Sequence, residues 1–433
     1  MALAGRDLVS IFDFSDREIE GIFDLADEMP LKAPLGPHGA PEGDGSRRGC
    51  LTIAGGAILS TLFYEPSTRT RLSFEAAMLR LGGGVISVAD TKATSVAKGE
   101  TIADTVRIIE SYADIIVMRH PLEGSARVAA DYASVPVVNA GDGSHEHPTQ
   151  TLLDLYTIRR EKGKLRGLSV ALVGDLRYGR TAHSLAFGLA RFGAKVTFVS
   201  PRGLEMPAHL LRRLEKEFDC SPAQYQSLGD VVTDPDSLAT LRSSGAAPLR
   251  STSKRRGGDQ KALATEVVAT FDAVYVTRVQ RERFASEPAY QQAKKGYAIT
   301  DEILSRARPD TVVMHPLPRV DELSYELDHD PRSVYFKQAA YGLPIRMALL
   351  AALLGKRVPK VKPSRKGDYR PVPRHEVDFH GITELPCPNQ QCVTNHETYL
   401  RPHFLFVKHA PDTIACAFCE HEMPSPLKHG EAR

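Results

Sequence analysis

The sequence predicts an α/β protein with two tandem doubly wound parallel-sheet domains and a small C-terminal β domain that contains four cysteines. Between residue 47 and about residue 341, short β-branched apolar runs alternate with longer amphipathic segments. This pattern is typical of parallel strands covered by helices. The alternation starts a second series after Gln150, which indicates a second sheet. Four of the six cysteines lie within the last fifty residues, which predicts a third, smaller unit.

Length and composition limit the class of protein. A chain of 433 residues corresponds to about three domains of 100–200 residues. Hydrophobic residues make up 42% and charged residues 25%, as is usual for globular proteins. The formal net charge of +2 is too small to indicate nucleic acid or a membrane as a partner. No signal-peptide pattern and no run of about 18 apolar residues occurs, so we expect a cytoplasmic protein.

The first series predicts alternating strands and helices. Leu72, Ala76 and Leu79 recur at positions i, i+4 and i+7, which places them on one apolar face of a helix. The flanking runs are short and rich in β-branched residues, as in buried strands. In chain order the segments are ILSTLFY at 58–64, RLSFEAAMLRLG at 71–82, VISVAD at 85–90, GETIADTVRIIESY at 99–112 and DIIVMRH at 114–120.

The second series follows a long helical pattern, TQTLLDLYTIRREKG at 149–163, which has no turn signal before Gly163. We expect this helix to bridge the two domains. After it the same alternation of strand and helix returns. The segments are LSVALVGD at 168–175, RTAHSLAFGLARFG at 180–193, AKVTFVSP at 194–201, FDAVYVTRVQ at 271–280 and DTVVMHPLPR at 310–319.

Two stretches interrupt the pattern. Residues 233–262 are rich in Ser, Gly, Pro and Arg, which predicts a long surface insertion. Residues 356–378 contain eight Lys or Arg and four Pro, which predicts a semi-extended, solvated linker; nucleic-acid contact is the alternative. The expected boundaries are a first domain at 1–150 completed by a C-terminal helix at about 338–356, a second domain at 151–337, a linker at 357–379 and a C-terminal domain at 380–433.

Residues 67–71 combine two arginines, two threonines and a serine at the turn between an expected strand and an expected helix. A helix N-terminus exposes unpaired N–H groups and the positive end of the helix dipole, so hydroxyl and guanidinium groups there can converge on a phosphate. Arginine binds two phosphate oxygens at once. The alternative is that Ser67 or Thr68 caps the helix and that Arg69 and Arg71 are solvated.

Five blocks resemble a known family. PSTRTRLSFE resembles the carbamoyl-phosphate signature of the aspartate and ornithine carbamoyltransferase superfamily. HPTQTLLDLY, VGDLRYGRTAHSL, TRVQRER and MHPLPR follow in the order of that family. The resemblance covers residues 1–356 apart from the insertion at 233–262. It implies that the first domain binds carbamoyl phosphate and the second an amino acid.

The resemblance implies specific roles around carbamoyl phosphate. Arg119 would contact a phosphate oxygen and the carbonyl oxygen, His147 would donate to the carbonyl oxygen, and Gln150 would hold the carbamoyl amide. Read without the family, Arg119 could be a charge at a strand end and His147 a structural hydrogen bonder. The implied catalytic residues are Arg69, Thr70, Arg119 and His147. The implied carbamoyl-phosphate residues are Ser67, Thr68, Arg69, Thr70, Arg119, His147, Gln150, Leu317 and Pro318.

The chemistry requires donors for a developing oxyanion and an uncharged amine. Thr70, Arg119 and His147 would supply the donors. Leu317 and Pro318 form a rigid turn whose backbone carbonyls can accept from the amine and the carbamoyl NH₂ group; a stiff turn at a strand end is the alternative. No motif contains an activated nucleophile, so we expect no covalent intermediate, and the resemblance implies that the departing phosphate can accept the amine proton. We expect Arg319 to be structural.

The acceptor site is expected to hold a dicarboxylic amino acid. Arg180 and Arg278 provide two guanidinium groups and Gln280 a neutral donor, and a buried carboxylate must be paired. Ornithine enzymes of the family typically have HCLP where this chain has HPLPR, so we predict L-aspartate, with N-carbamoyl-L-aspartate and phosphate as products. The alternatives are an ornithine carbamoyltransferase and a noncatalytic scaffold. VGDLRYGRTAHS matches neither the Walker nor the dinucleotide fingerprint, and we expect no organic cofactor.

The loop TKATSVAKGET at 91–101 is polar and contains glycine. In the family an equivalent loop gives a serine and a lysine, here Ser95 and Lys98, to the active site of the neighbouring subunit, with the lysine contacting the amino acid. The resemblance therefore implies a trimer as the smallest catalytic unit. An exposed lysine that is only solvated is the alternative.

The C-terminal cysteines form two close pairs. Cys387 and Cys392 are separated by four residues and Cys416 and Cys419 by two, and in a reducing compartment this spacing indicates structural Zn²⁺ more than disulfides. We expect the metal to provide most of the folding free energy of so small a domain. Because four cysteines already complete a tetrahedral site, we expect the nearby histidines not to bind the metal. These are His396, His403, His409 and His421.

The cysteine segment CPNQQC and the stretch HFLFVKHAPDTIACAFCEHEM resemble the zinc domain of the aspartate carbamoyltransferase regulatory chain, which docks onto the catalytic chain. The gap between Leu354 and Leu385 is too short for the nucleotide-binding domain of that chain. We therefore expect a module that braces two trimers or recruits a separate regulatory subunit, without a nucleotide site of its own. A zinc ribbon that contacts nucleic acid is the competing interpretation.

Overall fold

The computed structural model describes residues 3–29, 51–88, 98–226, 271–278, 286, 290, 297–301, 304, 307–320, 322–357, 369, 376–377, 385–407 and 410–426. The chain divides into two compact units, one of Met1–Leu153 with Tyr341–Arg433 and one of Asp154–Ala340. The predicted insertion at 233–262, most of the linker, Ser95, Gln280 and His409 lie outside the described residues.

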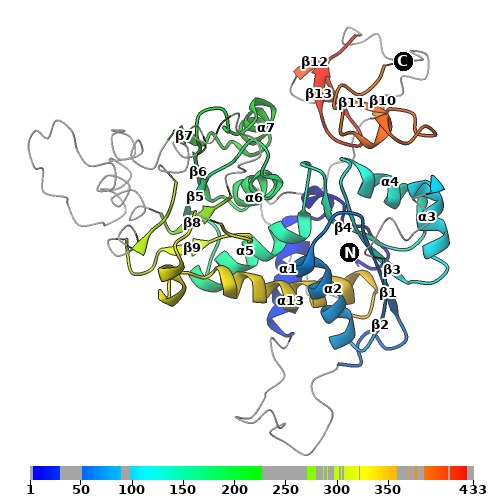
Figure 1. The fold of residues 1–433 in the computed structure, drawn as a ribbon, viewed down its shortest axis with the longest axis horizontal. Coiled ribbons are helices and arrows are strands. Elements are labelled where there is room, and N and C mark those ends of the chain that lie inside the picture. The colour runs from blue at the N-terminus through cyan, green and yellow to red at the C-terminus, as the bar shows by residue number, and fades with distance from the viewer. Residues whose placement is uncertain are drawn as a thin grey trace, which may run out of the picture. The chain divides into compact units, whose positions relative to one another are not determined.

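The first unit contains a four-stranded parallel sheet in the order β2-β1-β3-β4. Figure 1 shows α1 and α2 on one side of this sheet and α3 and α4 on the other. This is the doubly wound arrangement that the alternating sequence predicts. The strands are β1 (Ile58–Phe63), β2 (Gly84–Val88), β3 (Ile115–His120) and β4 (Val137–Asp142). The helices are η1 (Ile11–Asp13), α1 (Asp16–Asp27), α2 (Thr68–Arg80), α3 (Ile102–Ile109) and α4 (Ser125–Tyr132).

The apolar face predicted for α2 forms, but it is not the face that packs into the core. Leu72 and Leu79 are 49% and 52% exposed, whereas Phe74, Ala77 and Met78 are buried. The periodicity correctly predicts a helix, but two apolar stripes run along it. The stripe with the aromatic residue packs inside the first unit, and the leucine stripe remains on its surface.

The second unit contains a five-stranded parallel sheet in the order β7-β6-β5-β8-β9. Its buried strands supply a core that includes Val173, Val274 and Val276. The strands are β5 (Ser169–Val173), β6 (Lys195–Val199), β7 (Ala223–Tyr225), β8 (Ala273–Val276) and β9 (Val312–Met314). The helices are α6 (Arg180–Arg191), α7 (Ala208–Phe218) and the short η5 (Tyr325–His329).

Two helices pass from one unit of the chain to the other. The boundary after Leu153 falls inside α5 (Pro148–Lys162), and the boundary after Ala340 falls inside α13 (Tyr335–Leu353). The bridging helix predicted at 149–163 therefore forms. None of the helices in the described part of the chain is long and apolar enough to span a bilayer.

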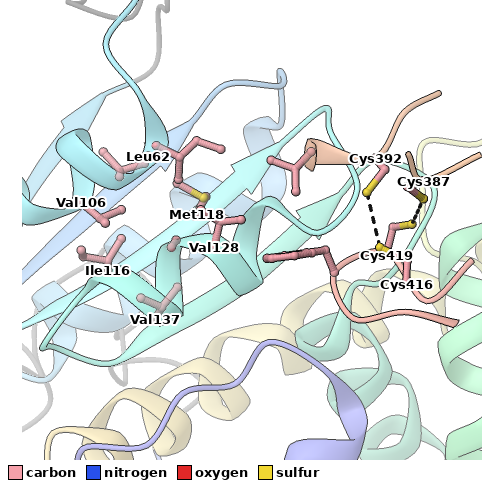
Figure 2. Close-up of a cluster of buried hydrophobic side chains, with 14 of the residues drawn as sticks. Leu62, Val106, Ile116, Met118, Val128, Val137, Cys387, Cys392, Cys416 and Cys419 are labelled. Atoms are coloured by element: carbon pink, nitrogen blue, oxygen red, sulfur yellow. Dashed lines mark hydrogen bonds between the residues drawn. The ribbon is translucent and has the colours of Figure 1, made fainter. Parts of the chain in front are cut away.

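The C-terminal segment of the first unit forms a small antiparallel sheet in the order β10-β11-β12-β13, so the predicted fold class is confirmed. Its cysteines and Phe404 belong to the same buried cluster as Ile116 and Val137 of the parallel sheet. Figure 2 shows this apolar cluster extending from the sheet to the four cysteines. The elements are β10 (Glu376–Val377), η6 (Val393–Asn395), β11 (Phe404–Val407), β12 (Ala410–Cys416) and β13 (Glu422–Pro424).

Candidate active site and metal centre

The predicted anion-binding residues of the first unit lie at the carboxyl edge of its sheet. From the inner strand β1 the chain runs outward to β2 and then returns to β3 on the other side of β1. Open α/β sheets bind ligands at such a switch point, outside the carboxyl ends of the strands. Residues 67–70 follow β1 directly, and Arg119 is the penultimate residue of β3. Lys98 follows β2 and His147 follows β4 at the same edge.

The N-terminus of α2 is not capped by its own serine. Ser67 occupies the N-cap position, and its side chain makes no capping hydrogen bond. Ser15 and Thr101 occupy the same position in α1 and α3, and their hydroxyls do accept from the backbone N–H three residues later. The capping alternative is therefore wrong for Ser67, and Thr68 is already the first residue of the helix. The positive end of α2 thus remains available to an anion.

The arginines and threonines of this motif differ in their surroundings. Thr70 is buried, whereas Arg69 is exposed at the turn. Partial burial lowers the pKa of Arg69, but a guanidinium stays cationic in proteins. Arg71 lies one turn before Glu75 and pairs with it at 3.7 Å. Of the two arginines, Arg69 is the more exposed and lies closer in sequence to the loop that follows β1.

Arg119 is held beneath the loop that follows β1. Its Nη2 lies 3.1 Å from an oxygen of Glu65, and its Nη1 donates to the carbonyl oxygen of Ala140 at 3.3 Å. The β3–β4 register shifts between Met118 and His120, and such bulges re-aim side chains beside functional sites. Its side chain is only 12% exposed. Arg119 is therefore a positioned guanidinium and not a solvated charge at a strand end.

His147 precedes α5 and is buried. Its carbonyl oxygen accepts from the N–H groups of Gln150 and Thr151, so it begins the helix. Its Nδ1 lies 3.3 Å from the hydroxyl of Thr149. Gln150 is half-buried and lies within the first turn of the same helix. Both predicted side chains thus start from one rigid element.

The residues that hold the loop before His147 were not predicted from the sequence. Asp142 ends β4, is buried, and accepts hydrogen bonds from the Gly124 N–H at 2.9 Å and the Glu146 N–H at 3.1 Å. Glu146 in turn accepts from the hydroxyl of Ser10 at 2.6 Å. A signal was present in the sequence, because VVNAGD is a β-branched run that ends in a carboxylate. The two carboxylates fix the loop that leads to His147.

The second unit has a switch point of its own. From β5 the chain runs outward to β6 and β7 and then returns to β8 on the other side of β5. Arg180 is the first residue of α6, the helix after β5, and Arg278 follows β8. Arg180 is half-buried and Arg278 is exposed. The two predicted acceptor-binding arginines therefore flank the place where this sheet can hold a ligand.

The turn after β5 requires glycine. Gly174 has a φ of 119°, and a Cβ at this position would lie 2.4 Å from the carbonyl oxygen of Thr277. The ends of β5 and β8 can therefore approach only if residue 174 has no side chain. Asp175 then accepts from the N–H groups of Arg177 and Tyr178, which shapes the turn that leads to Arg180.

The turn at residues 315–319 follows β9 and is held by a histidine. His315 Nδ1 accepts from the Leu317 N–H at 2.8 Å, and its Nε2 lies 2.8 Å from Glu322 Oε1, so Nε2 carries the proton. Leu317 has a φ of 55° and the Leu317–Pro318 peptide is cis. Arg319 pairs with Asp328 and donates to the hydroxyl of Tyr335 at 2.9 Å. These contacts agree with a structural role for Arg319.

The four C-terminal cysteines converge as predicted. All are buried and free of disulfides, and their sulfurs lie within 4.8 Å of one another. The Cys387–Cys419 and Cys392–Cys416 sulfur distances are 3.5 and 3.8 Å, close to the roughly 3.8 Å between thiolates around a tetrahedral metal. The cluster therefore fits a tetrahedral metal ion.

The cysteine domain is docked on the parallel-sheet domain of the first unit through Glu123. The Glu123 N–H donates to the Gln391 carbonyl oxygen and its own carbonyl oxygen accepts from the Val393 N–H, both at 2.9 Å. Gly124 beside it has a φ of 86°, and a Cβ there would lie 2.7 Å from the side chain of Phe418. Backbone pairing and close packing thus join the two domains of this unit.

Three family models match the chain in succession. Residues 6–160 match the carbamoyl-P binding domain of aspartate/ornithine carbamoyltransferase. Residues 166–244 and 247–353 match the Asp/Orn binding domain of the same family. Residues 379–425 match the metal binding domain of the aspartate carbamoyltransferase regulatory chain. Domains of the catalytic chain and a domain of the regulatory chain are therefore matched by successive parts of one polypeptide.

Similar proteins and solved structures carry the same family name. The aspartate carbamoyltransferase catalytic subunits of Thermoplasma acidophilum and Clostridium botulinum are both 44% identical over 82% of this chain and 99–100% of their own length. The catalytic subunit of M. jannaschii aspartate transcarbamoylase is 43% identical with a TM-score of 0.65, over 81% of this chain and 98% of that one. The Trypanosoma cruzi aspartate transcarbamoylase solved with carbamoyl phosphate is 36% identical with a TM-score of 0.66, over 81% and 97%.

Proposed function

The chain belongs to the aspartate/ornithine carbamoyltransferase family, and on this premise we propose that it transfers the carbamoyl group of carbamoyl phosphate to the α-amino group of L-aspartate. The products are N-carbamoyl-L-aspartate and phosphate, a step of de novo pyrimidine biosynthesis. The observation that carries the proposal is the placement of arginines at both switch points. Each sheet thereby offers a cationic site where open α/β sheets bind ligands.

The first cationic site suits the phosphate of carbamoyl phosphate. The uncapped N-terminus of α2 supports this assignment, because free N–H groups and the helix dipole attract an oxyanion. Ser67, Thr68 and Thr70 add hydroxyl donors, and Arg69 adds a guanidinium that can bind two oxygens. The guanidinium of Arg69 and the positive end of the α2 dipole would therefore attract the phosphate at the same end of the helix.

Arg119 and His147 are proposed to act on the carbonyl group. Attack by an amine places negative charge on the carbonyl oxygen, and preorganised donors lower the barrier most when they do not have to move. The burial of His147 and the restraint of Arg119 by Ala140 support this role, because both side chains are held in place. Gln150 is proposed to hold the carbamoyl NH₂ group. The departing phosphate is proposed to accept the proton of the amine.

The second cationic site suits the carboxylates of aspartate. Arg180 and Arg278 flank the switch point of the second sheet, and guanidinium groups bind carboxylates in a bidentate manner. Gln280 and the loop residue Lys98 are proposed as additional contacts. The carbonyl groups of Leu317 and Pro318 are proposed to accept from the amine and carbamoyl NH₂ groups. A cationic acceptor such as ornithine would be repelled by the two arginines.

A trimer is proposed as the smallest catalytic unit, with Ser95 and Lys98 reaching the site of a neighbouring subunit. The exposed leucine stripe of α2 supports this, together with Ile86 on the edge strand β2, which is 36% exposed. Exposed large apolar side chains on a helix and on an edge strand are what a subunit contact would cover. Lys98 lies on the segment that follows that strand and is exposed.

The cysteine centre is proposed to bind Zn²⁺ in a structural role. Cys387, Cys392, Cys416 and Cys419 would hold the ion, which would organise the small domain and take no part in the transfer. Four free thiols are in keeping with a reducing, cytoplasmic compartment. Bracing of two trimers, or recruitment of a separate regulatory subunit, is proposed as the task of this domain. Native mass measured with and without a chelator tests it: an assembly that stays unchanged on metal loss would count against bracing.

A substrate-competition assay tests the proposed reaction. The purified full chain is given carbamoyl phosphate with either L-aspartate or L-ornithine, and the carbamoylated product is measured. We expect carbamoyl-aspartate as the main product. Faster carbamoylation of ornithine would overturn the acceptor assignment, and carbamoylation of neither amino acid would favour the noncatalytic scaffold.

A further inference from the structure

A second cluster of metal-ligating side chains contains none of the four cysteines. His145 and Glu146 belong to the loop after β4, and Glu420 follows Cys419 in the docked domain. The potential ligand atoms of His145, Glu146 and Glu420 all lie within 4.8 Å of one another. Glu146 is buried and the other two are half-buried. The cluster therefore joins the parallel-sheet domain to the cysteine domain inside the first unit.

The ring of His145 is oriented by a carboxylate. Its Nδ1 lies 3.0 Å from Asp142 Oδ2, and Asp142 is itself fixed by the Gly124 N–H and the Asn139 side chain. Because Asp142 accepts, Nδ1 is a donor and Nε2 is left for another partner. His145 Nε2 is inaccessible to solvent and hydrogen-bonds to none of the described residues. Metal-bound histidines have this arrangement, in which a carboxylate holds the nitrogen that does not bind the metal.

Residues outside the cluster also hold the side chain of Glu146. One carboxylate oxygen accepts from the Ser10 hydroxyl at 2.6 Å and the other from the Ile11 N–H at 3.1 Å. These contacts fix the direction of the carboxylate, whose two oxygens can each accept more than one contact. Two of the three ligand side chains are thus held in place by other residues.

The charge balance of the cluster favours a cation. Three carboxylates act on His145, those of Asp142, Glu420 and Glu146. A single imidazolium would neutralise only one of the three carboxylates, and buried charge of one sign needs compensation.

We propose that His145, Glu146 and Glu420 bind a divalent transition-metal ion, distinct from the ion of the cysteine centre. One imidazole nitrogen and two carboxylates suit Zn²⁺ or Mn²⁺ and leave positions for water. The ion would connect the cysteine domain to the loop that leads to His147. Nothing in this inference depends on the proposed carbamoyl transfer.

Mn²⁺ is the probe that separates the two centres, because it binds carboxylate and imidazole ligands and competes poorly for four thiolates. The full chain is first loaded with one Zn²⁺ per chain and then titrated with Mn²⁺, which is followed by electron paramagnetic resonance. We expect one bound Mn²⁺ per chain. We expect His145→Asn and Glu420→Gln to weaken Mn²⁺ binding at least tenfold, since a lost ligand should cost no less than a lost outer-shell partner.

His421→Asn is the matched control, because His421 is the exposed neighbour of Glu420, and we expect it to bind Mn²⁺ as the unaltered chain does. Replacing the first ion by Co²⁺ and recording its thiolate charge-transfer absorption checks that the cysteine centre is intact in each variant. Absence of Mn²⁺ binding by the unaltered chain, or equal binding by all four proteins, would overturn the proposal. The cluster would then be an ion-paired network held by an imidazolium.

Discussion

The side-chain amide of Asn389 donates to Glu123 Oε2 at 2.6 Å. The other carboxylate oxygen of Glu123 accepts from the Ser144 N–H at 3.2 Å. One carboxylate therefore links the first cysteine pair of the C-terminal domain to the loop that leads to His147.

Asn389→Ala is expected to weaken the docking of the cysteine domain. A hydrogen bond to a charged group contributes about 1.5–3 kcal/mol, and the Glu123 carboxylate would lose one partner while remaining partly buried. Thermal unfolding of the zinc-loaded chain should therefore begin at a lower temperature. Gln390→Ala is the control, because the Gln390 residue is exposed and its backbone is unchanged. Equal unfolding curves for the two variants would show that the Asn389 contact is unimportant.

Arg69→Ala is expected to lower kcat by about 10²–10³-fold, the effect of removing one donor to developing charge. The exposed position of Arg69 at the helix turn means that its loss should leave the fold intact, which circular dichroism can verify. Arg80→Ala, in the last turn of the same helix, should retain activity. A fall in kcat of similar size in both variants would argue for a general defect of α2.

Mixed trimers test whether a neighbouring subunit supplies Lys98. Chains with Lys98→Ala and chains with Arg69→Ala are each expected to be inactive as homo-oligomers. After dissociation and reassembly together, some interfaces should combine the intact Arg69 of one chain with the intact Lys98 of another. Recovery of a measurable fraction of the activity is expected. If mixtures stay as inactive as their components, the shared site is wrong.

Arg278→Ala is expected to raise the KM for aspartate more than the KM for carbamoyl phosphate, because the guanidinium pairs with a carboxylate of the acceptor. Initial rates with each substrate varied in turn provide both constants. Arg166→Ala serves as a control, since Arg166 is exposed in the same unit but precedes β5, at the opposite edge of the sheet. A larger rise in KM for carbamoyl phosphate would place Arg278 with the other substrate.

His120 is expected to make stability fall in mild acid. Burial lowers the pKa of His120 to about 4, against an ordinary value of 6.5, although Asp142 opposes the shift. The unfolded chain then binds more protons than the folded chain between these values, so stability is full above pH 6.5 and decreases as pH falls towards 4. The difference corresponds to about 3 kcal/mol at most. His120→Asn, which keeps an acceptor for the Leu122 N–H, should show a smaller loss, measured by urea unfolding at pH 7 and pH 5.

Much of the fold could be predicted because local patterns specify it. β-branched runs and helical periodicity correctly indicate the elements from 58 to 120, and α5 forms where the uninterrupted pattern at 149–163 predicts a bridging helix. The face of α2 could not be predicted, because Leu79 and Phe74 lie on different stripes of similar hydrophobicity. Only the packing partner decides which stripe is buried.

In the candidate site, too, some features could be predicted from the local sequence and others depend on tertiary contacts. Residues 67–70 follow a strand and begin a helix, so an anion-binding turn could be predicted from adjacent positions alone. The ion pair of Glu65 and Arg119 could not be predicted from the sequence, because a β-bulge and strand pairing bring these residues together. The supporting carboxylate of Asp142 was missed because its role depends on Gly124 and His145, which the sheet places beside it.

The sequence by itself determined the chemistry and the order of the parts: a hydroxyl and guanidinium turn, two arginines in a second α/β series, and two cysteine pairs with the spacing of a thiolate metal centre. These features depend on neighbouring residues, whose relative positions follow from backbone geometry. Only the tertiary structure decided that the order of the parallel strands reverses where those residues lie, and that Glu420 meets His145. Contacts between distant segments depend on how complete surfaces pack, which no local pattern of residues encodes.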